Sequence, residues 1–216
     1  SEYSLTRSRL RGVVSRRFIR ASSAKLQELM ERELSGHDLV ALFLDGKSFG
    51  DDEMVIAIGV TLTGDKVMLG MVQTASENTR VCREFLKSLV ARGLQYEQGL
   101  LCVLDGAKGF HRAVREVFGS AAVIQRCRWH KRENVLEYLP LSKRPATRRK
   151  LQAAYQQPTY EQAKAALRRV RSVLALMNQS AARSLDDRLE ETLTLHRLGL
   201  AEELRLSLAT TNVIES

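Results

Sequence analysis

The sequence predicts an α/β protein in which a mixed β-sheet is followed by a block of helices. Five short apolar runs have the length of buried strands, and two segments with helical spacing lie among them, which gives the order βββαβαβ. Beyond Pro140 the strand signals end and only helical periodicity continues. With 216 residues, 44% of them hydrophobic, the chain is long enough for one sizeable domain with an insertion and can bury a core.

The strands are predicted from short apolar runs bounded by turn residues. The first three form an antiparallel meander, because a Thr-Gly-Asp turn joins the second strand to the third. The predicted strands are Leu39–Leu44, Met54–Leu62, Lys66–Gln73, Leu100–Leu104 and Ala121–Gln125. A helix from Ser22 or Ser23 to Leu34 precedes them. Two more are expected from Asn78, as the N-cap, to Arg92 and from Phe110 to Phe118.

The region after Pro140 is predicted to be entirely helical. Thr159 and Gln162 have the spacing of a capping box at the start of its second helix. The expected helices are Arg148–Tyr155, Tyr160–Met177, Ala181–Arg197 and Ala201–Leu206. The expected units are a basic, helical segment (1–36), a sheet core (37–139), a helical insertion (140–208) and the start of a final core helix (209–216). Because that last pattern opens and then stops, we expect a core excised from a longer protein.

The net charge of +9 is concentrated in two segments. Residues 1–20 hold six arginines and one acid, and residues 126–150 hold nine bases and two acids, so the remainder is net negative. Such local basicity indicates a polyanionic partner, and nucleic acid is the commonest one. Acidic lipid is the competing partner, but no basic amphipathic helix with an aromatic face and no apolar run of about 20 residues is present. The three scattered cysteines favour a reducing, cytosolic setting.

Two aspartates follow predicted buried strands at Asp-Gly steps, Asp45 and Asp105. If the first and fourth strands are parallel neighbours, these carboxylates emerge at the same edge of the sheet. Two carboxylates that close require protonation or a divalent cation, and oxygen ligands favour Mg²⁺. Asp-Gly is also ordinary turn chemistry. For either aspartate alone the turn is the better interpretation, whereas the pair on this strand order favours a metal.

Two other patterns are weaker. Gly46-Lys47-Ser48 resembles the end of a phosphate-binding loop, but the glycine which that loop needs five residues earlier is Ala41. Cys127 and His130 have the spacing of metal ligands, yet no second Cys/His pair has a comparable spacing, so a structural zinc site is not expected.

Five motifs then occur in a characteristic order. They are LFLDGKSF around Asp45, SENTRVCREFLKSLVARGL, VLDGAKGF around Asp105, QRCRWHKRENV and the terminal TTNVIES. From about Leu39 to Ser216, their order and spacing resemble the catalytic core of Mutator-type bacterial insertion-sequence transposases. These enzymes belong to the DDE superfamily and have a ribonuclease H-like fold. Single motifs of this kind are weak signals, but five in sequence are strong.

The resemblance implies that Asp45, Asp105 and Glu215 form a catalytic triad of metal ligands. They would hold two Mg²⁺ ions, with Mn²⁺ as a substitute, for DNA end cleavage and strand transfer by in-line displacement at phosphorus. The all-helical block would be an insertion in the ribonuclease H-like core. His130, in the Cys-x-x-His motif, would contact the scissile phosphate or a metal-bound water, with Cys127 packed beneath it.

The basic residues around this site are candidate DNA contacts. They would hold phosphates, which position DNA without specifying its sequence, although each is equally well explained as a solvated charge. Trp129 is expected to stack on an unpaired base or, with at least equal weight, to serve a core or an interface. The DNA-binding candidates are Lys47, Lys108, Arg126, Arg128, Trp129, Lys131, Arg132, Arg148 and Arg149.

The resemblance also implies partners and a location. Double-stranded DNA, as element ends and target, is the expected substrate; two ends must be synapsed, so a homodimer on DNA is expected. The setting would be the bacterial cytoplasm, in association with the nucleoid. Two alternatives stay open: a metal-dependent nuclease or resolvase with this fold, which would cut without joining, and a domesticated DNA-binding module without catalysis. The presence of all three acids argues against the second.

Overall fold

The computed structural model describes residues 22–49, 52–74 and 79–201. Its centre is a five-stranded mixed β-sheet with the strands in the spatial order β3-β2-β1-β4-β5. The strands are β1 (Leu39–Phe49), β2 (Asp52–Thr61), β3 (Lys66–Thr74), β4 (Leu100–Leu104) and β5 (Ala122–Arg126). The predicted order of elements, βββαβαβ, is confirmed.

Strand direction divides the sheet into two parts. β1, β2 and β3 form an antiparallel meander, whereas β4 pairs in parallel with both β1 and β5. The parallel pairing of β1 with β4 ends at Leu44 opposite Leu104, so the residues that follow these two positions emerge at one edge of the sheet. This is the arrangement of a ribonuclease H-like fold, as predicted.

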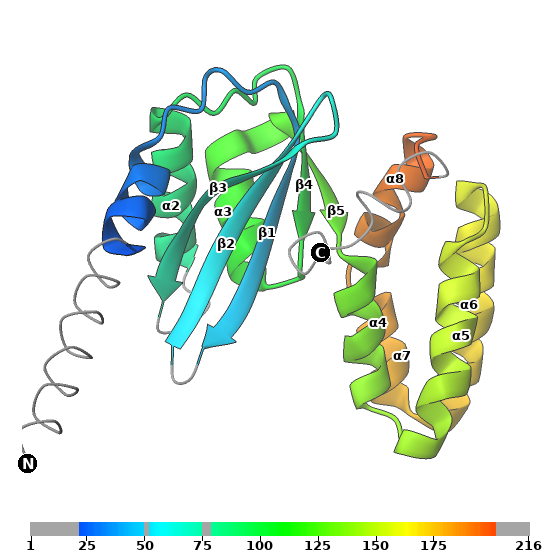
Figure 1. Cartoon of the computed structure of the whole chain (residues 1–216). Helices are drawn as coiled ribbons and strands as arrows, with labels where there is room; N and C mark the ends of the chain where they lie inside the picture. Colours follow the sequence, from blue (N-terminus) through cyan, green and yellow to red (C-terminus); the bar gives the residue numbers. More distant parts are fainter. Residues whose placement is uncertain (1–21, 50–51, 75–78, 202–216) are drawn as a thin grey trace, which may run out of the picture.

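One face of the sheet is covered by α2 (Thr79–Ala91) and α3 (Lys108–Phe118), which the 3₁₀ turn η1 (Gly119–Ala121) follows (Figure 1). A helix over residues 22–31 also packs there through Met30. The fully buried side chains on this face include Leu42, Leu44, Leu69, Leu86, Leu89 and Val114. Burying one such leucine stabilises the fold by about 1.5–3 kcal/mol.

The opposite face of the sheet has a smaller core. Ala41, Phe43 and Val103 point to this side, because side chains alternate along a strand. They pack against Leu195 and Ala201, near the end of the described chain. The chain therefore returns to the sheet after the helical region.

The helical region forms a unit with its own core beside the β5 edge of the sheet (Figure 1). Its elements are α4 (Arg128–Glu137), η2 (Leu141–Lys143), α5 (Arg144–Tyr155), α6 (Tyr160–Met177), α7 (Gln179–Asp186), η3 (Leu189–Leu193) and α8 (Thr194–Arg197). Val135 and Leu136 of α4 belong to that core. Packing therefore begins the helical unit at α4, before the expected boundary at residue 140.

Two helix predictions differ from the structure. α4 was not predicted, because its buried positions include Arg128 and Lys131, which break the apolar periodicity. The single helix expected over Ala181–Arg197 is wrong, since α7 ends at Asp186 and Arg188 adopts a left-handed conformation with φ 50°. By contrast, α6 has the predicted bounds, and the Thr159 hydroxyl accepts a hydrogen bond from the Gln162 amide as expected.

Several predictions concern segments outside the described residues. These are the N-terminal basic segment, the Asn78 cap, the helix expected after Ala201 and the terminal motif that contains Glu215. Over the ranges that are described, no helix is both long enough and apolar enough to cross a membrane.

Candidate active site

Asp45 lies within β1 and not at its end. The strand was expected to stop at the Asp45-Gly46 step, but it continues to Phe49 because β2 goes on pairing with it after the parallel partner β4 has ended. Asp45 lies opposite Ile56, and Gly46 lies opposite Val55. A paired strand thus holds the Asp45 side chain, which is only 1% exposed.

Asp105 directly follows β4 and reaches across to β1. Its Oδ1 accepts a hydrogen bond from the Ala107 amide at 2.8 Å, and its Oδ2 accepts one from the Gly46 amide at 3.4 Å. The structure therefore brings the second aspartate to the residue next to Asp45. Burial is the main cause that raises the pKa of the Asp105 carboxyl, and the negative charge of Asp45 adds to it, while the two amides and His130 partly offset the rise.

His130 approaches the same carboxylates from the first turn of α4. Its Nε2 lies 3.6 Å from Asp45 Oδ1. Burial disfavours the charged imidazole, but a hydrogen bond with the Cys127 side chain and the charges of Cys127, Asp45 and Asp105 outweigh burial, so the pKa of His130 is raised. The Cys127 amide donates to Leu104 O at 2.7 Å, which ties the start of α4 to the end of β4. Cys127 is fully buried.

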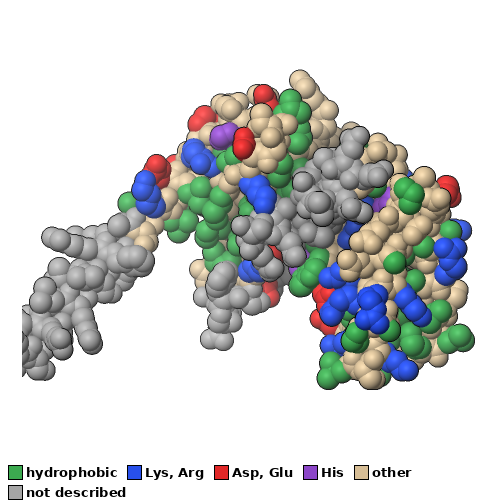
Figure 2. Space-filling model, turned by 45° about the vertical axis from the view of Figure 1, so that its right-hand side comes forward, with side chains coloured by type: hydrophobic (Ala, Val, Ile, Leu, Met, Phe, Trp, Pro, Cys, Tyr) green, Lys and Arg blue, Asp and Glu red, His purple; other side chains and the backbone are tan. Residues whose placement is uncertain are grey.

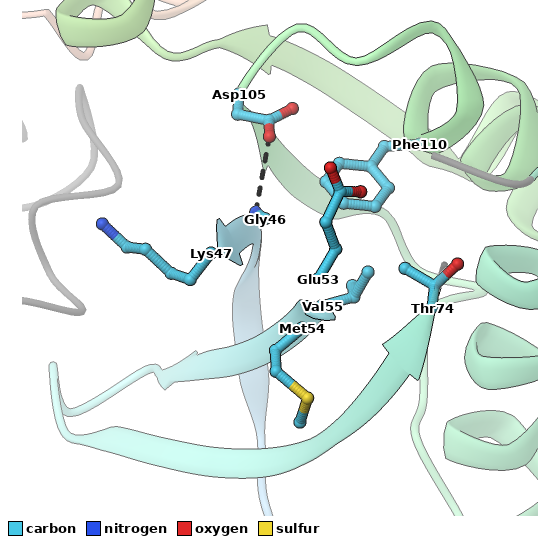
Figure 3. Close-up of a pocket in the computed structure, with 8 residues that line it drawn as sticks. All are labelled: Gly46, Lys47, Glu53, Met54, Val55, Thr74, Asp105 and Phe110. Carbon is cyan, nitrogen blue, oxygen red and sulfur yellow. Dashed lines mark hydrogen bonds between the residues drawn. The ribbon is translucent and has the colours of Figure 1, made fainter. Parts of the chain in front are cut away.

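A pocket of about 160 Å³ is lined by Asp105 and by Gly46 and Lys47, the two residues that follow Asp45. Its lining residues are Gly46, Lys47, Glu53, Met54, Val55, Thr74, Asp105 and Phe110, shown in Figure 3. Lys47 Nζ lies 3.4 Å from Asp45 Oδ2, which places a positive charge against the buried carboxylate. Glu53 was not predicted as a site residue. The alternation of side chains along a strand could have indicated it, because Glu53 and Val55 are two positions apart on β2 and therefore lie on the same face of the sheet.

Three of the basic residues predicted to contact DNA have their charged groups inside the protein. Arg126, Arg128 and Lys131 are 5%, 6% and 0% exposed. Arg126 binds the Asp187 carboxylate at 2.5 Å, and Arg128 Nε donates to Thr192 O at 3.0 Å. Their assignment as DNA contacts is therefore corrected: Arg126 joins β5 to the helical unit, and Arg128 and Lys131 join α4 to the segments around α7 and η3.

The other predicted contacts lie nearer the surface. Lys108 and Arg149 are exposed, whereas Arg132 and Arg148 are ion-paired with the two carboxylate oxygens of Glu133 at 3.0 and 2.7 Å. Trp129 is half-buried, with its ring edge-on to His130 at a centroid distance of 4.8 Å. Trp129 is thus a direct neighbour of His130.

Lys131 predicts a specific pH dependence of stability. Burial lowers the pKa of this amine to about 7, while an unfolded lysine titrates near pH 10.4. Between these values the unfolded chain binds more protons than the folded chain, so the free energy of unfolding contributed by Lys131 rises with pH. Urea unfolding between about pH 7 and 10 is expected to give a flatter pH profile for Lys131→Met than for the unmodified chain. Parallel profiles would contradict this assignment.

The donor set at the site matches a hard divalent cation in chemical type. Mg²⁺ is commonly bound through one or two carboxylates together with substrate phosphates and water. Asp45 and Asp105 supply two such groups, and their mutual repulsion would be relieved by a cation. In the part of the chain that the structure describes, no cluster of three or more His, Cys, Asp and Glu residues is arranged to hold a metal ion. The third predicted ligand, Glu215, lies outside that part.

Comparison with known proteins identifies a family. Residues 9–216 match the model of the transposases of the Mutator family. The chain is 31% identical over 191 residues to the transposase for insertion sequence element IS6120 of Mycolicibacterium smegmatis, which covers 86% of this chain and 58% of that protein. It is 33% identical over 164 residues to the transposase for IST2 of Acidithiobacillus ferrooxidans, covering 76% and 54%. The chain thus spans little more than half the length of either relative.

Proposed function

Because the chain belongs to the Mutator family of transposases, as its motifs indicated, we propose that it is the catalytic core of an insertion-sequence transposase. The proposed activity is cleavage of DNA at the ends of the element and transfer of the freed 3′-hydroxyl to a target strand. The observation that carries this proposal is the buried Asp45 beside Asp105, with His130 3.6 Å away.

Asp45 and Asp105, together with Glu215, would hold Mg²⁺, for which Mn²⁺ is a substitute. When bound, the metal activates the attacking oxygen and stabilises the leaving oxygen of an in-line displacement. The paired strand β1 keeps the Asp45 carboxylate in place, and the two backbone amides that bind Asp105 orient the second carboxylate. Such preorganisation lowers the cost of ordering the site during reaction.

The residues around the carboxylates would position the DNA. Lys47 and His130 both contact Asp45 and are partly exposed, so either can turn to a phosphate that enters the site. We propose that Trp129 stacks on a base displaced next to the cut, since stacking contributes about 1–3 kcal/mol per base. Lys108, at the start of α3, is exposed on the Asp105 side and completes this group.

The helical unit would bind DNA farther from the cut. Figure 2 shows lysine and arginine side chains gathered over this unit. Exposed basic residues on α5 and α6 are Arg148, Arg149, Lys150, Arg168 and Arg169. Contacts of this kind bind phosphates and weaken as salt rises. A homodimer would bring two element ends together, with double-stranded DNA as both donor and target.

The proposal is tested by an assay that separates cutting from joining. A labelled duplex from the DNA flanking the coding sequence serves as donor and a supercoiled plasmid as target, with Mg²⁺ and with a chelator as the control. We expect nicked donor and covalently joined products that depend on the divalent ion. Cutting without joining would identify a nuclease or resolvase instead, and salt-sensitive binding without either reaction would identify a DNA-binding module.

A further inference from the structure

A short turn after α7 binds two basic side chains, Arg126 and Lys131, that come from the active-site side of the molecule. Asp187 accepts a hydrogen bond from Arg126 through both its carboxylate, at 2.5 Å, and its backbone carbonyl, at 3.3 Å. Lys131 Nζ donates to the backbone carbonyls of Ser184 and Asp187. These carbonyls lie at the C-terminus of α7, where the helix dipole favours a positive charge. Arg126 lies in space against the residue that follows Asp105. Lys131 follows His130 in the sequence.

Arg126 lies directly against the backbone that follows Asp105. A Cβ atom built on Gly106 would lie 2.6 Å from both Nε and Nη2 of Arg126 and 2.7 Å from its Cζ. The glycine has φ +106°, a conformation that side chains of L-residues rarely adopt. The guanidinium therefore fits against the Asp105-Gly106 turn only because position 106 has no side chain. Any displacement of Arg126 removes the group that supports this turn.

Lys131 connects the same α7 turn to the other part of the site. It is the residue after His130 on α4 and is fully buried. Its bonds to the turn hold α4 against α7, and the rotation of α4 decides whether His130 faces Asp45. One short turn thus touches the neighbours of both Asp105 and His130.

We propose that Asp187 is a positioning residue for the active site, which fixes Asp105 through Arg126 and His130 through the turn that binds Lys131. This inference rests on the proposed function, in which these two residues take part in DNA chemistry. Asp187 itself does not touch the carboxylates. Its side chain is 56% exposed, whereas that of Arg126 is 6% exposed, so the carboxylate can be changed without opening a hole in the core.

The neighbouring Asp186 provides a matched control. It belongs to the same turn region and also pairs with an arginine, at 3.0 Å from Arg171 Nη2, but this pair lies on the outside of the helical unit, with both partners more than 40% exposed. Asp186→Asn and Asp187→Asn therefore remove the same charge. Only the second change affects Arg126.

We expect Asp187→Asn to lower kcat for DNA joining by about 10- to 100-fold with little change in KM, because small misplacements of reacting groups are costly. Asp186→Asn is expected to behave as the unmodified chain, and Asp187→Glu to recover part of the rate. A second readout needs no activity: Trp129, the only tryptophan, reports on α4 through its fluorescence emission and its quenching by acrylamide. Both should change in metal-free Asp187→Asn but not in Asp186→Asn.

Two results would overturn the positioning role. One is Trp129 fluorescence that is the same in Asp187→Asn as in the unmodified chain; the other is an equal loss of kcat in both asparagine variants. If the unmodified chain joins no DNA, the proposed function fails, but the fluorescence comparison still decides whether Asp187 controls the placement of α4. A unique fluorescence change in Asp187→Asn would then support positioning by itself.

Discussion

Asp45→Asn is expected to abolish DNA cleavage and joining together, with a loss on the order of 1,000-fold or more, as when a principal electrostatic group of an active site is removed. Asparagine keeps the shape of the side chain and loses its negative charge. Because Asp45 is 1% exposed, water cannot take the place of the missing carboxylate. The same charge raises the pKa of Asp105 but also attracts Lys47 and His130, so its removal relieves one repulsion, weakens two attractions and should leave the protein folded.

The measurement compares nicked and joined products, DNA affinity and urea unfolding for the same preparations. DNA affinity is expected to be retained, because the phosphate contacts proposed for the helical unit are untouched. Asp38→Asn is the control, since Asp38 is an exposed acid that precedes β1, seven residues before Asp45. Substantial joining by Asp45→Asn would refute the assignment of Asp45, and a loss explained by unfolding would appear in the urea curves.

Gly106→Ala is expected to have the second largest effect, because it disturbs both backbone and packing at the active site. The new methyl group would meet the Arg126 guanidinium at 2.6–2.7 Å, on a backbone with φ +106°. Conformational strain and overpacking together are expected to lower the free energy of unfolding by about 2–5 kcal/mol. Joining should fall by about 100-fold or more in the fraction that remains folded, because the Asp105 turn must shift.

Gly99→Ala separates these two causes. Gly99 has nearly the same φ, +109°, but a Cβ atom there would meet nothing within 4 Å. Backbone strain alone should therefore lower the free energy of unfolding of Gly99→Ala, by about 1–3 kcal/mol, and the joining rate of this variant should be unchanged. Chemical denaturation and joining assays on both variants provide the comparison. Equal losses of stability and activity at the two glycines would show that contact with Arg126 is unimportant.

Elements with strong local signals could be predicted from the sequence almost to the residue. β4 has the predicted bounds, Leu100–Leu104, because a continuous apolar run lies between Gly99 and Asp105. α6 has the predicted bounds because Thr159 caps its start and apolar residues follow at helical spacing. In both cases the signal lies within the segment itself.

Elements stabilised by distant polar groups could not be predicted in this way. α4 buries Arg128 and Lys131, whose partners are more than 50 residues away. The segment after α7 leaves the helical path at Arg188 and is held by bonds such as that from the Thr194 hydroxyl to Ile124 O. The sequence does not distinguish a charged residue that faces solvent from one that faces an interior carbonyl. Hydrophobic periodicity therefore failed to predict α4 and the end of α7.

The sequence by itself determined the strands, the family motifs and the two Asp-Gly steps, because strand length and turn residues are local properties. The parallel pairing of β1 with β4 that brings Asp45 and Asp105 together was a condition of the prediction, which the structure confirmed. Only the tertiary structure decided which bases are interior. Whether a cation is exposed depends on carbonyls and carboxylates supplied by other parts of the chain, and Asp187 meets Arg126 across 61 residues. Three predicted DNA contacts, Arg126, Arg128 and Lys131, therefore bind groups inside the protein, since a buried charge must find its hydrogen-bond partners within the protein.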